Sequence, residues 1–411
     1  ELPSNDKKNV FTVPLNITYD FGKNLKVLRP RKKDKNGHEY SFKRDGRIPE
    51  FGHIPSKLQE KQIEIDWYPR IQSIDSKSKR KDLDKQQSTF SDLHLSFLNY
   101  NDLFFRLEKF KRERTWYNIN ISKSKIEDTL KDSTWYRMYI PTGRMDTAVI
   151  YNIRLWQEMA CELLQKYCEE YYNYCKAAFI EPRLELRALE KEDGNIPVED
   201  EYQLIVDTNE QALIDDILKL KSDIETDTKG ILTTGDLKAC LFDTHLYQPV
   251  VHASKNSKIQ ITPASLNESE FHFIEDLKGY LKTDNIVSEV YLLRNESRGK
   301  GVGFFEAGNF YPDFLLWQIK DGKEYLAFIE PHGLQHEGPG HKKIQFHKII
   351  KEIQDRLNGS GVTLNSYIVS TTRFSKLNWG LSIDDLADMN VFFMIDNKDN
   401  YIKNIMKDML K

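Results

Sequence analysis

The spacing of apolar residues in the last third of the chain predicts a sheet flanked by helices. Three runs have the length and the β-branched or aromatic content of buried strands: Ile286 to Arg294, Phe310 to Ile319 and Tyr325 to Glu330. A fourth, Thr363 to Ser370, follows a segment with helical apolar spacing, Lys343 to Leu357. A strand that follows such a helix can pair in parallel with an earlier strand. The order therefore predicts a mixed sheet with a crossover helix.

A helix is expected just before the first of these strands, from Glu268 to Lys282. Ser265-Leu-Asn-Glu268 has the pattern of a capping box that opens it. After the sheet, Asn390 to Ile395 predicts a further strand and Tyr401 to Leu410 a closing helix.

The upstream two thirds of the chain are expected to hold strands and a helical connector. The strands predicted there are Asn9 to Thr18, Lys61 to Ile71, Asp200 to Asp207, His245 to His252 and Lys258 to Ile261; the helices are Asn99 to Arg114, Thr147 to Ala178 and Asn209 to Asp223. We therefore expect an α/β (α+β) protein with three parts: a basic β-containing segment with a linker (1–95), a helical connector (96–229) and a C-terminal domain with a mixed sheet flanked by helices (230–411).

Length and charge set only broad limits. A chain of 411 residues can build two or three domains, and a net charge of -3 gives no global argument for nucleic acid. The segment Arg29 to Arg47 is locally basic and carries Tyr40 and Phe42. It is either a solvated loop or a phosphate-contacting segment. Ser73 to Ser91 has few apolar residues and predicts an exposed linker or loop.

Cysteine usage and the absence of targeting signals favour a reducing compartment. Cys161, Cys168 and Cys175 recur every seven residues, which places them on one helix face as small buried side chains. The chain begins at Glu1 and shows neither a signal peptide nor a long apolar span. We expect a cytoplasmic piece of a longer protein that has no contact with a membrane.

Two acids stand where burial is costly. Asp313 lies inside the apolar run that begins at Phe310, and Glu330 ends the run that begins at Tyr325. The turn Lys320-Asp-Gly-Lys323 would bring both acids to one end of a hairpin. A buried carboxylate needs a cation or a buried partner, and carboxylate oxygens suit Mg²⁺ or Mn²⁺.

Pro312-Asp313, a hairpin and then Glu330-Pro331-His332 resembles the metal-binding core of the PD-(D/E)xK nuclease superfamily. The flanking words YLLRNESRGKGVGFFEAGNFYPDF and LAFIEPHGL resemble the C-terminal nuclease of helicase-nucleases related to type III restriction subunits. This resemblance implies that Asp313, Glu330 and the Pro331 carbonyl hold the metal. It also implies one carboxylate from a helix, for which we choose Glu270 because it lies one position from the apolar stripe.

The sequence departs from that pattern at His332, where the superfamily usually has lysine. Three alternatives follow: His332 orients the attacking water, Lys342 or Lys343 takes the place of the lysine, or the site is weak. A zinc site is an alternative, because His332, His336, His341 and His347 lie close together in the sequence. The glycines and proline in this stretch exclude a helical HExxH arrangement.

A basic, glycine-containing loop lies between the first two predicted strands, from Arg294 to Gly308. Arg294, Arg298 and Lys300 are candidates for phosphate contact, together with Lys342 and Lys343, and Glu306 is a spare acid.

The resemblance, together with the two costly acids, implies an Mg²⁺- or Mn²⁺-dependent DNA endonuclease module of a restriction or phage-defence helicase-nuclease. The expected partners are double-stranded DNA and an ATP-driven motor, which lies upstream in the same polypeptide or on another subunit. The alternative is a degenerate nuclease fold that binds nucleic acid or acts as a scaffold.

Overall fold

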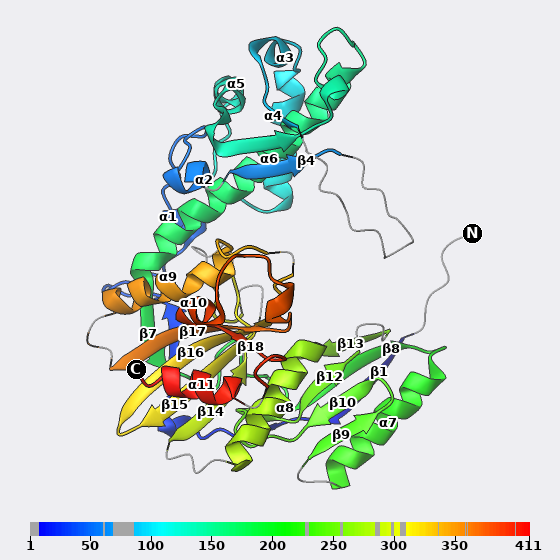
Figure 1. Ribbon diagram of the computed structural model, residues 1–411, viewed down its shortest axis with the longest axis vertical. Helices are drawn as coiled ribbons and strands as arrows, with labels where there is room; N and C mark the ends of the chain where they lie inside the picture. The colour runs from blue at the N-terminus through cyan, green and yellow to red at the C-terminus, as the bar shows by residue number, and fades with distance from the viewer. Residues whose placement is uncertain are drawn as a thin grey trace. The chain divides into compact units, whose positions relative to one another are not determined.

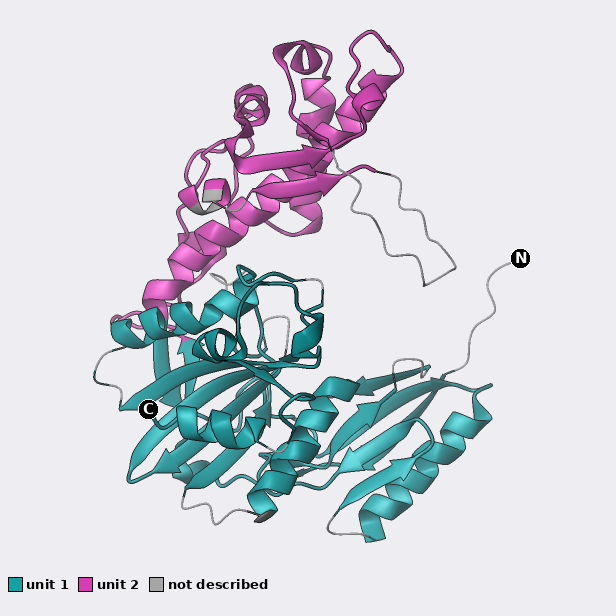
Figure 2. Ribbon diagram, viewed as in Figure 1, with its two compact units in different colours: residues 1–29, 184–411 teal, residues 30–183 magenta. Residues whose placement is uncertain are grey.

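The computed structural model describes residues 8–60, 62–68, 86–226, 230–254, 258–283, 288–296, 300–304, 310–335, 337–357, 359, 361–398 and 400–411. It confirms a mixed α/β protein. Two compact units divide the chain (Figure 2): unit 1 comprises Glu1–Arg29 and Leu184–Lys411, and unit 2 comprises Pro30–Arg183. The divisions thus fall at 29/30 and 183/184, whereas the expected boundaries were 95/96 and 229/230.

The main sheet of unit 1 has five strands in sequence order (Figure 1). They are β14 (Glu289–Arg294), β15 (Phe314–Lys320), β16 (Lys323–His332), β17 (Val362–Ser370) and β18 (Val391–Phe393). The first three are antiparallel, whereas β17 pairs in parallel with both β16 and β18. The sequence predicted this hairpin and crossover, but Asp313 directly precedes β15 instead of lying inside a strand.

The turn between β15 and β16 sets the register of the site. Asp321 and Gly322 adopt positive φ angles of 52° and 74°, as a two-residue hairpin turn requires. Lys320 pairs with Lys323, and the register continues to Phe314 opposite Ile329. Asp313 and Glu330 therefore lie close to each other at the end of the hairpin remote from this turn.

Helices cover both faces of the sheet. On one face lies α9 (Lys342–Arg356), whose Phe346 ring lies 6.4 Å from that of Phe328. On the other lies α8 (Glu268–Thr283), whose Phe273 ring lies 5.4 Å from that of Phe314. Successive residues of a strand face opposite sides of a sheet. Phe328 therefore faces α9, and Ile329, which pairs with Phe314, faces α8. Two further helices are α10 (Ile383–Asp388) and α11 (Tyr401–Asp408).

Unit 1 also contains smaller sheets, some of which pair N-terminal strands with strands from the middle of the chain. In one of them β1 (Lys8–Pro14) pairs with β8 (Glu201–Asp207), which pairs with β13 (Ile259–Thr262). The remaining elements are β2 (Asn16–Ile17), β3 (Lys26–Pro30), β7 (Leu184–Ala188), α7 (Gln211–Thr226), β9 (Ile231–Thr234), β10 (Leu237–Cys240), β11 (Tyr247–Gln248) and β12 (Val250–Ala253). The N-terminal strand thus belongs to the same unit as the C-terminal sheet.

Unit 2 is built around the long helix α6 (Asn152–Ile180). Cys161, Cys168 and Cys175 lie buried along it, as their spacing predicts, and all are free thiols. The other elements are α1 (Phe42–Asp45), α2 (Ser56–Glu60), β4 (Ile63–Asp66), β5 (Gln87–Ser88), α3 (Asp92–Ser96), α4 (Tyr100–Glu113), α5 (Lys123–Lys131) and β6 (Tyr136–Tyr139). Among the helices in the described ranges, none combines the length and apolar character needed to cross a bilayer.

Candidate acidic site at one end of the sheet

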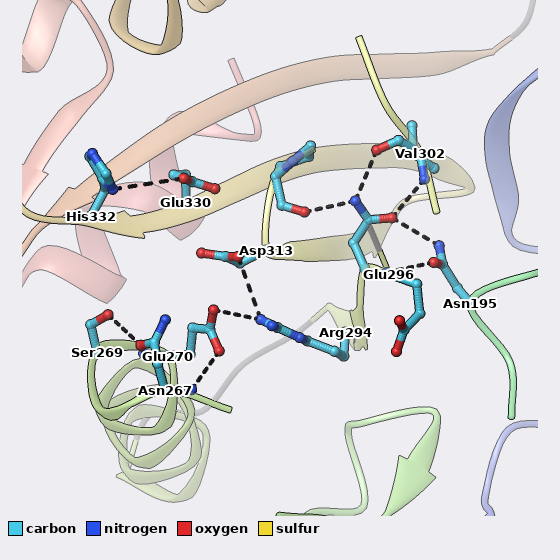
Figure 3. A network of polar contacts seen from close by, with 12 residues as sticks. Asn195, Asn267, Ser269, Glu270, Arg294, Glu296, Val302, Asp313, Glu330 and His332 are labelled. Atoms are coloured by element: carbon cyan, nitrogen blue, oxygen red, sulfur yellow. Dashed lines mark hydrogen bonds and ion pairs between the residues drawn. The ribbon is translucent and has the colours of Figure 1, made fainter. Parts of the chain in front are cut away.

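Four charged side chains lie close together at the end of the sheet opposite the Lys320–Lys323 turn (Figure 3). Arg294 is the last residue of β14, and Asp313 directly precedes β15. Glu330 lies near the end of β16, and Glu270 projects from the first turn of α8. The hairpin register places the first three side by side, because Arg294 is paired with Phe314, and Phe314 with Ile329.

Glu270 is fixed by a capping box at the start of α8. The backbone N–H of Asn267 donates to Glu270 Oε2 at 2.8 Å, and the Glu270 N–H donates to Asn267 Oδ1 at 3.0 Å. The predicted box between Ser265 and Glu268 is therefore wrong by two residues, because the asparagine is the capping residue. Glu270 is 3% exposed, whereas Glu268 is on the surface. Of these two acids, only Glu270 turns into the site.

The guanidinium of Arg294 contacts two carboxylates. Its Nη1 lies 2.9 Å from Glu270 Oε1 and 3.6 Å from Asp313 Oδ1. The Arg294 side chain is only 12% exposed. The prediction that Arg294 contacts phosphate does not match this arrangement. The guanidinium points inward and contacts Glu270 and Asp313.

Glu330 is paired with a lysine from α9. Lys343 Nζ lies 2.5 Å from Glu330 Oε1, and the Glu330 side chain is 6% exposed. Its second oxygen, Oε2, is buried and has no hydrogen-bond partner among the described residues. The cation beside the second acid thus comes from the first turn of a helix, which corresponds to one of the alternatives left open by His332.

His332 is held by a carboxylate on the loop before α9. Its Nε2 lies 2.7 Å from Glu337 Oε1, and Glu337 Oε2 lies 3.1 Å from His341 Nδ1. The Nδ1 of His332 lies 3.9 Å from Glu330 Oε1. An imidazole oriented in this way has one nitrogen on Glu337 and the other facing the acidic site.

Burial dominates the electrostatics of the two central acids. It raises the pKa of Asp313 well above its usual range, with further increases from Glu330 and Glu270 that Arg294 opposes. Burial also raises the pKa of Glu330, although the neighbouring Lys343 counteracts the shift. A further positive charge close to Asp313 and Glu330 would therefore stabilise the ionised form of both carboxylates.

A buried amide network fixes the backbone around Asp313 (Figure 3). Asn295 donates through Nδ2 to the carbonyls of Pro312 at 2.7 Å and Val302 at 2.9 Å. Its own N–H donates to the Asp313 carbonyl at 2.8 Å. Its Oδ1 accepts from Asn195 Nδ2 at 3.1 Å. These bonds tie the Pro312-Asp313 peptide to a second loop of unit 1.

The other predicted residues lie in several places. Pro331 is buried in β16 between Glu330 and His332, Lys342 is the first residue of α9, and Lys300 is exposed. Arg298, Glu306 and His336 lie outside the described residues. Sequence reasoning missed Glu337 and Asn295. The only available signal for Glu337 was an acid spaced between His332 and His341.

The side chains of this site are oxygen donors of the kind that bind a hard metal ion. Across the described ranges, no group of three or more His, Cys, Asp or Glu side chains is arranged to hold one. The chemistry of the donors nevertheless suits a hard cation, because Glu330 Oε2 is buried without a hydrogen bond and Asp313 is a raised-pKa carboxyl. The residue types therefore suit Mg²⁺ or Mn²⁺, but Arg294 contacts two of the acids, Glu270 and Asp313.

Comparisons with known proteins give no identification. The family models, the curated proteins and the solved structures were each searched, and none of them yielded a match to this chain.

Proposed function

We propose that this chain is an Mg²⁺- or Mn²⁺-dependent DNA endonuclease module that hydrolyses phosphodiester bonds. The observation that carries the proposal is the convergence of Asp313, Glu330 and Glu270 from three elements, with Lys343 in contact with Glu330. Buried acids of this kind with a nearby lysine are the groups that metal-assisted phosphoryl transfer uses.

Asp313, Glu330 and the Pro331 carbonyl would hold the cation, with Glu270 beside them. A bound divalent cation activates water and neutralises the scissile phosphate. Lys343 supplies a cation that stabilises negative charge on the phosphate, as the missing motif lysine would. His332, oriented by Glu337, orients the attacking water through Nδ1. Lys300 and Lys342 would contact the DNA backbone without sequence preference.

The wider setting follows the same proposal. We propose that the module acts on double-stranded DNA in the cytoplasm, in restriction or phage defence. ATP would be used only by a helicase motor, which lies upstream in the same polypeptide or on another subunit.

The test is cleavage of plasmid and linear DNA with Mg²⁺, Mn²⁺ or EDTA. We expect Asp313→Ala and Glu330→Ala to lower the rate by about a hundredfold or more, since each removes several kcal/mol of metal-dependent stabilisation. Lys343→Met should also impair cutting. The matched controls are Glu352→Gln and Lys348→Met, which change exposed residues of the same helix α9.

His332→Ala separates the two candidates for the role of the lysine. Loss of cutting in Lys343→Met alone would assign the role to Lys343, and loss in His332→Ala alone would assign it to His332. No cutting by the wild type with either metal, while DNA binding persists unchanged in every variant, would contradict the nuclease proposal.

A second candidate is a catalytically degenerate nuclease fold that binds nucleic acid or acts as a scaffold. The observation that favours it is the ion pairing of Arg294 with Glu270 and Asp313, because a fixed guanidinium can replace a metal as counter-ion. DNA binding that is independent of divalent metal, without cutting, is the expected result for this candidate.

A further inference from the structure

We infer that Arg294 is a built-in competitor of the divalent cation: its guanidinium and the metal bind the same oxygens of Glu270 and Asp313, so Arg294 sets the metal affinity of the site. This inference rests on the proposed function in one respect, namely that these carboxylates bind a divalent cation.

The contact geometry places one cationic nitrogen against two acids from different elements. Arg294 Nη1 lies 2.9 Å from Glu270 Oε1 on α8 and 3.6 Å from Asp313 Oδ1 before β15 (Figure 3). Glu270 Oε2 already accepts the Asn267 N–H. Oε1 is therefore the oxygen that Glu270 can offer to a metal, and it is the oxygen that Arg294 contacts.

Arg294 is held by contacts of both its backbone and its guanidinium. The Arg294 backbone N–H donates to His245 Nε2 at 2.9 Å. The guanidinium carbon lies 5.5 Å from the centre of the Phe314 ring. Since the side chain is only 12% exposed, water contributes little to its solvation. Leaving both acids would therefore expose a buried cation to an apolar surface, which favours its staying in place.

The charge balance leaves room for one more cation. Among the described residues, the permanently charged cations paired with Glu270, Asp313 and Glu330 are Arg294 and Lys343, and the His332 imidazole lies 3.9 Å from Glu330. Asp313 keeps 22% of its side chain exposed, which gives a divalent ion a path from solvent. To bind both Asp313 and Glu270, that ion has to displace Nη1 from their oxygens. The arginine therefore lowers metal affinity while it stabilises the metal-free protein.

The experiment measures Mn²⁺ binding to the metal-free full chain by electron paramagnetic resonance, without DNA. We expect Arg294→Gln to lower the Mn²⁺ Kd by about tenfold or more, because two carboxylates lose their competing cation. The melting temperature of this variant should be lower than that of wild type without metal and should rise more steeply when Mg²⁺ is added. Arg373→Gln, which removes the same charge from an exposed residue, should behave like wild type.

A second variant guards against misfolding. Arg294→Lys keeps a positive charge but cannot present the planar guanidinium, so its Mn²⁺ Kd should fall between those of wild type and Arg294→Gln. Adding Asp313→Asn to Arg294→Gln should abolish the gain in affinity. An unchanged or higher Kd in the folded Arg294 variants would overturn the inference.

DNA cutting by the same preparations separates the two claims. Tighter Mn²⁺ binding in Arg294→Gln with no cutting by any variant would support the competition and contradict the nuclease. Metal-dependent cutting with the same Kd in wild type and both Arg294 variants would support the nuclease and overturn the competition.

Discussion

Among the described residues of unit 1, two largely buried arginines, Arg29 and Arg294, contact carboxylates, and their surroundings differ in the balance of charge. Arg29 donates through Nε to Asp193 Oδ2 at 2.9 Å and through Nη2 to Oδ1, so one cation meets one acid in a forked contact. Arg294 instead meets two acids through a single nitrogen, and a third acid lies next to them. The balanced contact is typical of a structural pair, whereas surplus buried acid is typical of a site that receives another cation.

The largest effect is expected from breaking the balanced pair. Asp193→Asn leaves Arg29 as a buried guanidinium without its counter-charge, in a contact whose side chains are 9% and 2% exposed. We expect a loss of about 3–5 kcal/mol in the free energy of unfolding, measured by urea denaturation. A loss below about 1 kcal/mol would show that this pair behaves like a surface pair.

A smaller effect is expected from the histidine that supports Arg294. Burial lowers the pKa of His245 to about 3; the hydrogen bond to the Tyr247 carbonyl opposes this shift, and the positive charge of Arg294 adds to it. Since the folded pKa is below that of the unfolded chain, this stabilisation is present above about pH 6.5 and is lost as the pH falls. Between pH 6.5 and pH 5 it should decrease by about 2 kcal/mol.

The check is urea denaturation of wild type and His245→Asn across this pH range. The variant should lack this part of the pH dependence, whereas His38→Gln, at a histidine with a 79% exposed side chain, should keep it. Equal pH dependence in wild type and His245→Asn would contradict the prediction.

The same Asp-to-Asn change in the unbalanced cluster should have the opposite sign. The raised pKa of Asp313, caused first by burial and then by Glu330 and Glu270, means that its stabilising contribution is complete below about pH 4 and is lost as the pH rises through the folded pKa. Asp313→Asn should therefore stabilise the metal-free protein by about 1 kcal/mol at pH 7, a modest gain because Asp313 is 22% exposed.

Urea denaturation in EDTA measures this gain, and adding Mg²⁺ should reverse the order of the two proteins. A loss of stability in Asp313→Asn without metal, comparable to that of Asp193→Asn, would make the two contacts equivalent and would remove the distinction between them.

The smallest effect is expected from an exposed ion pair, which serves as a reference for the buried contacts. Lys23 pairs with Glu289 at 2.8 Å, but the two side chains are 44% and 61% exposed. Lys23→Met should change the free energy of unfolding by less than about 1 kcal/mol, and salt should reduce the difference further. A larger change that persists in high salt would indicate that packing of the lysine stem, not its charge, is responsible.

Local patterns predicted much of the C-terminal sheet. The Asp321-Gly322 turn, the antiparallel hairpin and the parallel strand after α9 follow from turn chemistry and from the period of apolar residues. Both central acids were found because a carboxylate within or beside an apolar run is costly. These features are encoded within a few residues of one another, so a single sequence can reveal them.

Contacts between distant segments could not be predicted in the same way. The pairing of β1 with β8 joins residues far apart in the chain, and neither strand carries a signal that names its partner. The inward turn of Arg294 and the reach of Lys343 to Glu330 depend on the directions of long side chains, which spacing does not determine. Asn267 also outcompeted Ser265 as the capping residue, although both fit the pattern.

The chain passes from unit 1 to unit 2 and back through two paired strands. The chain departs after β3 and returns in β7, and these two strands form a two-stranded sheet. Residues 30–183 therefore have the topology of an insertion between two paired strands of unit 1. A junction of this kind lets the inserted segment change in length or sequence without altering the register of the sheets in unit 1.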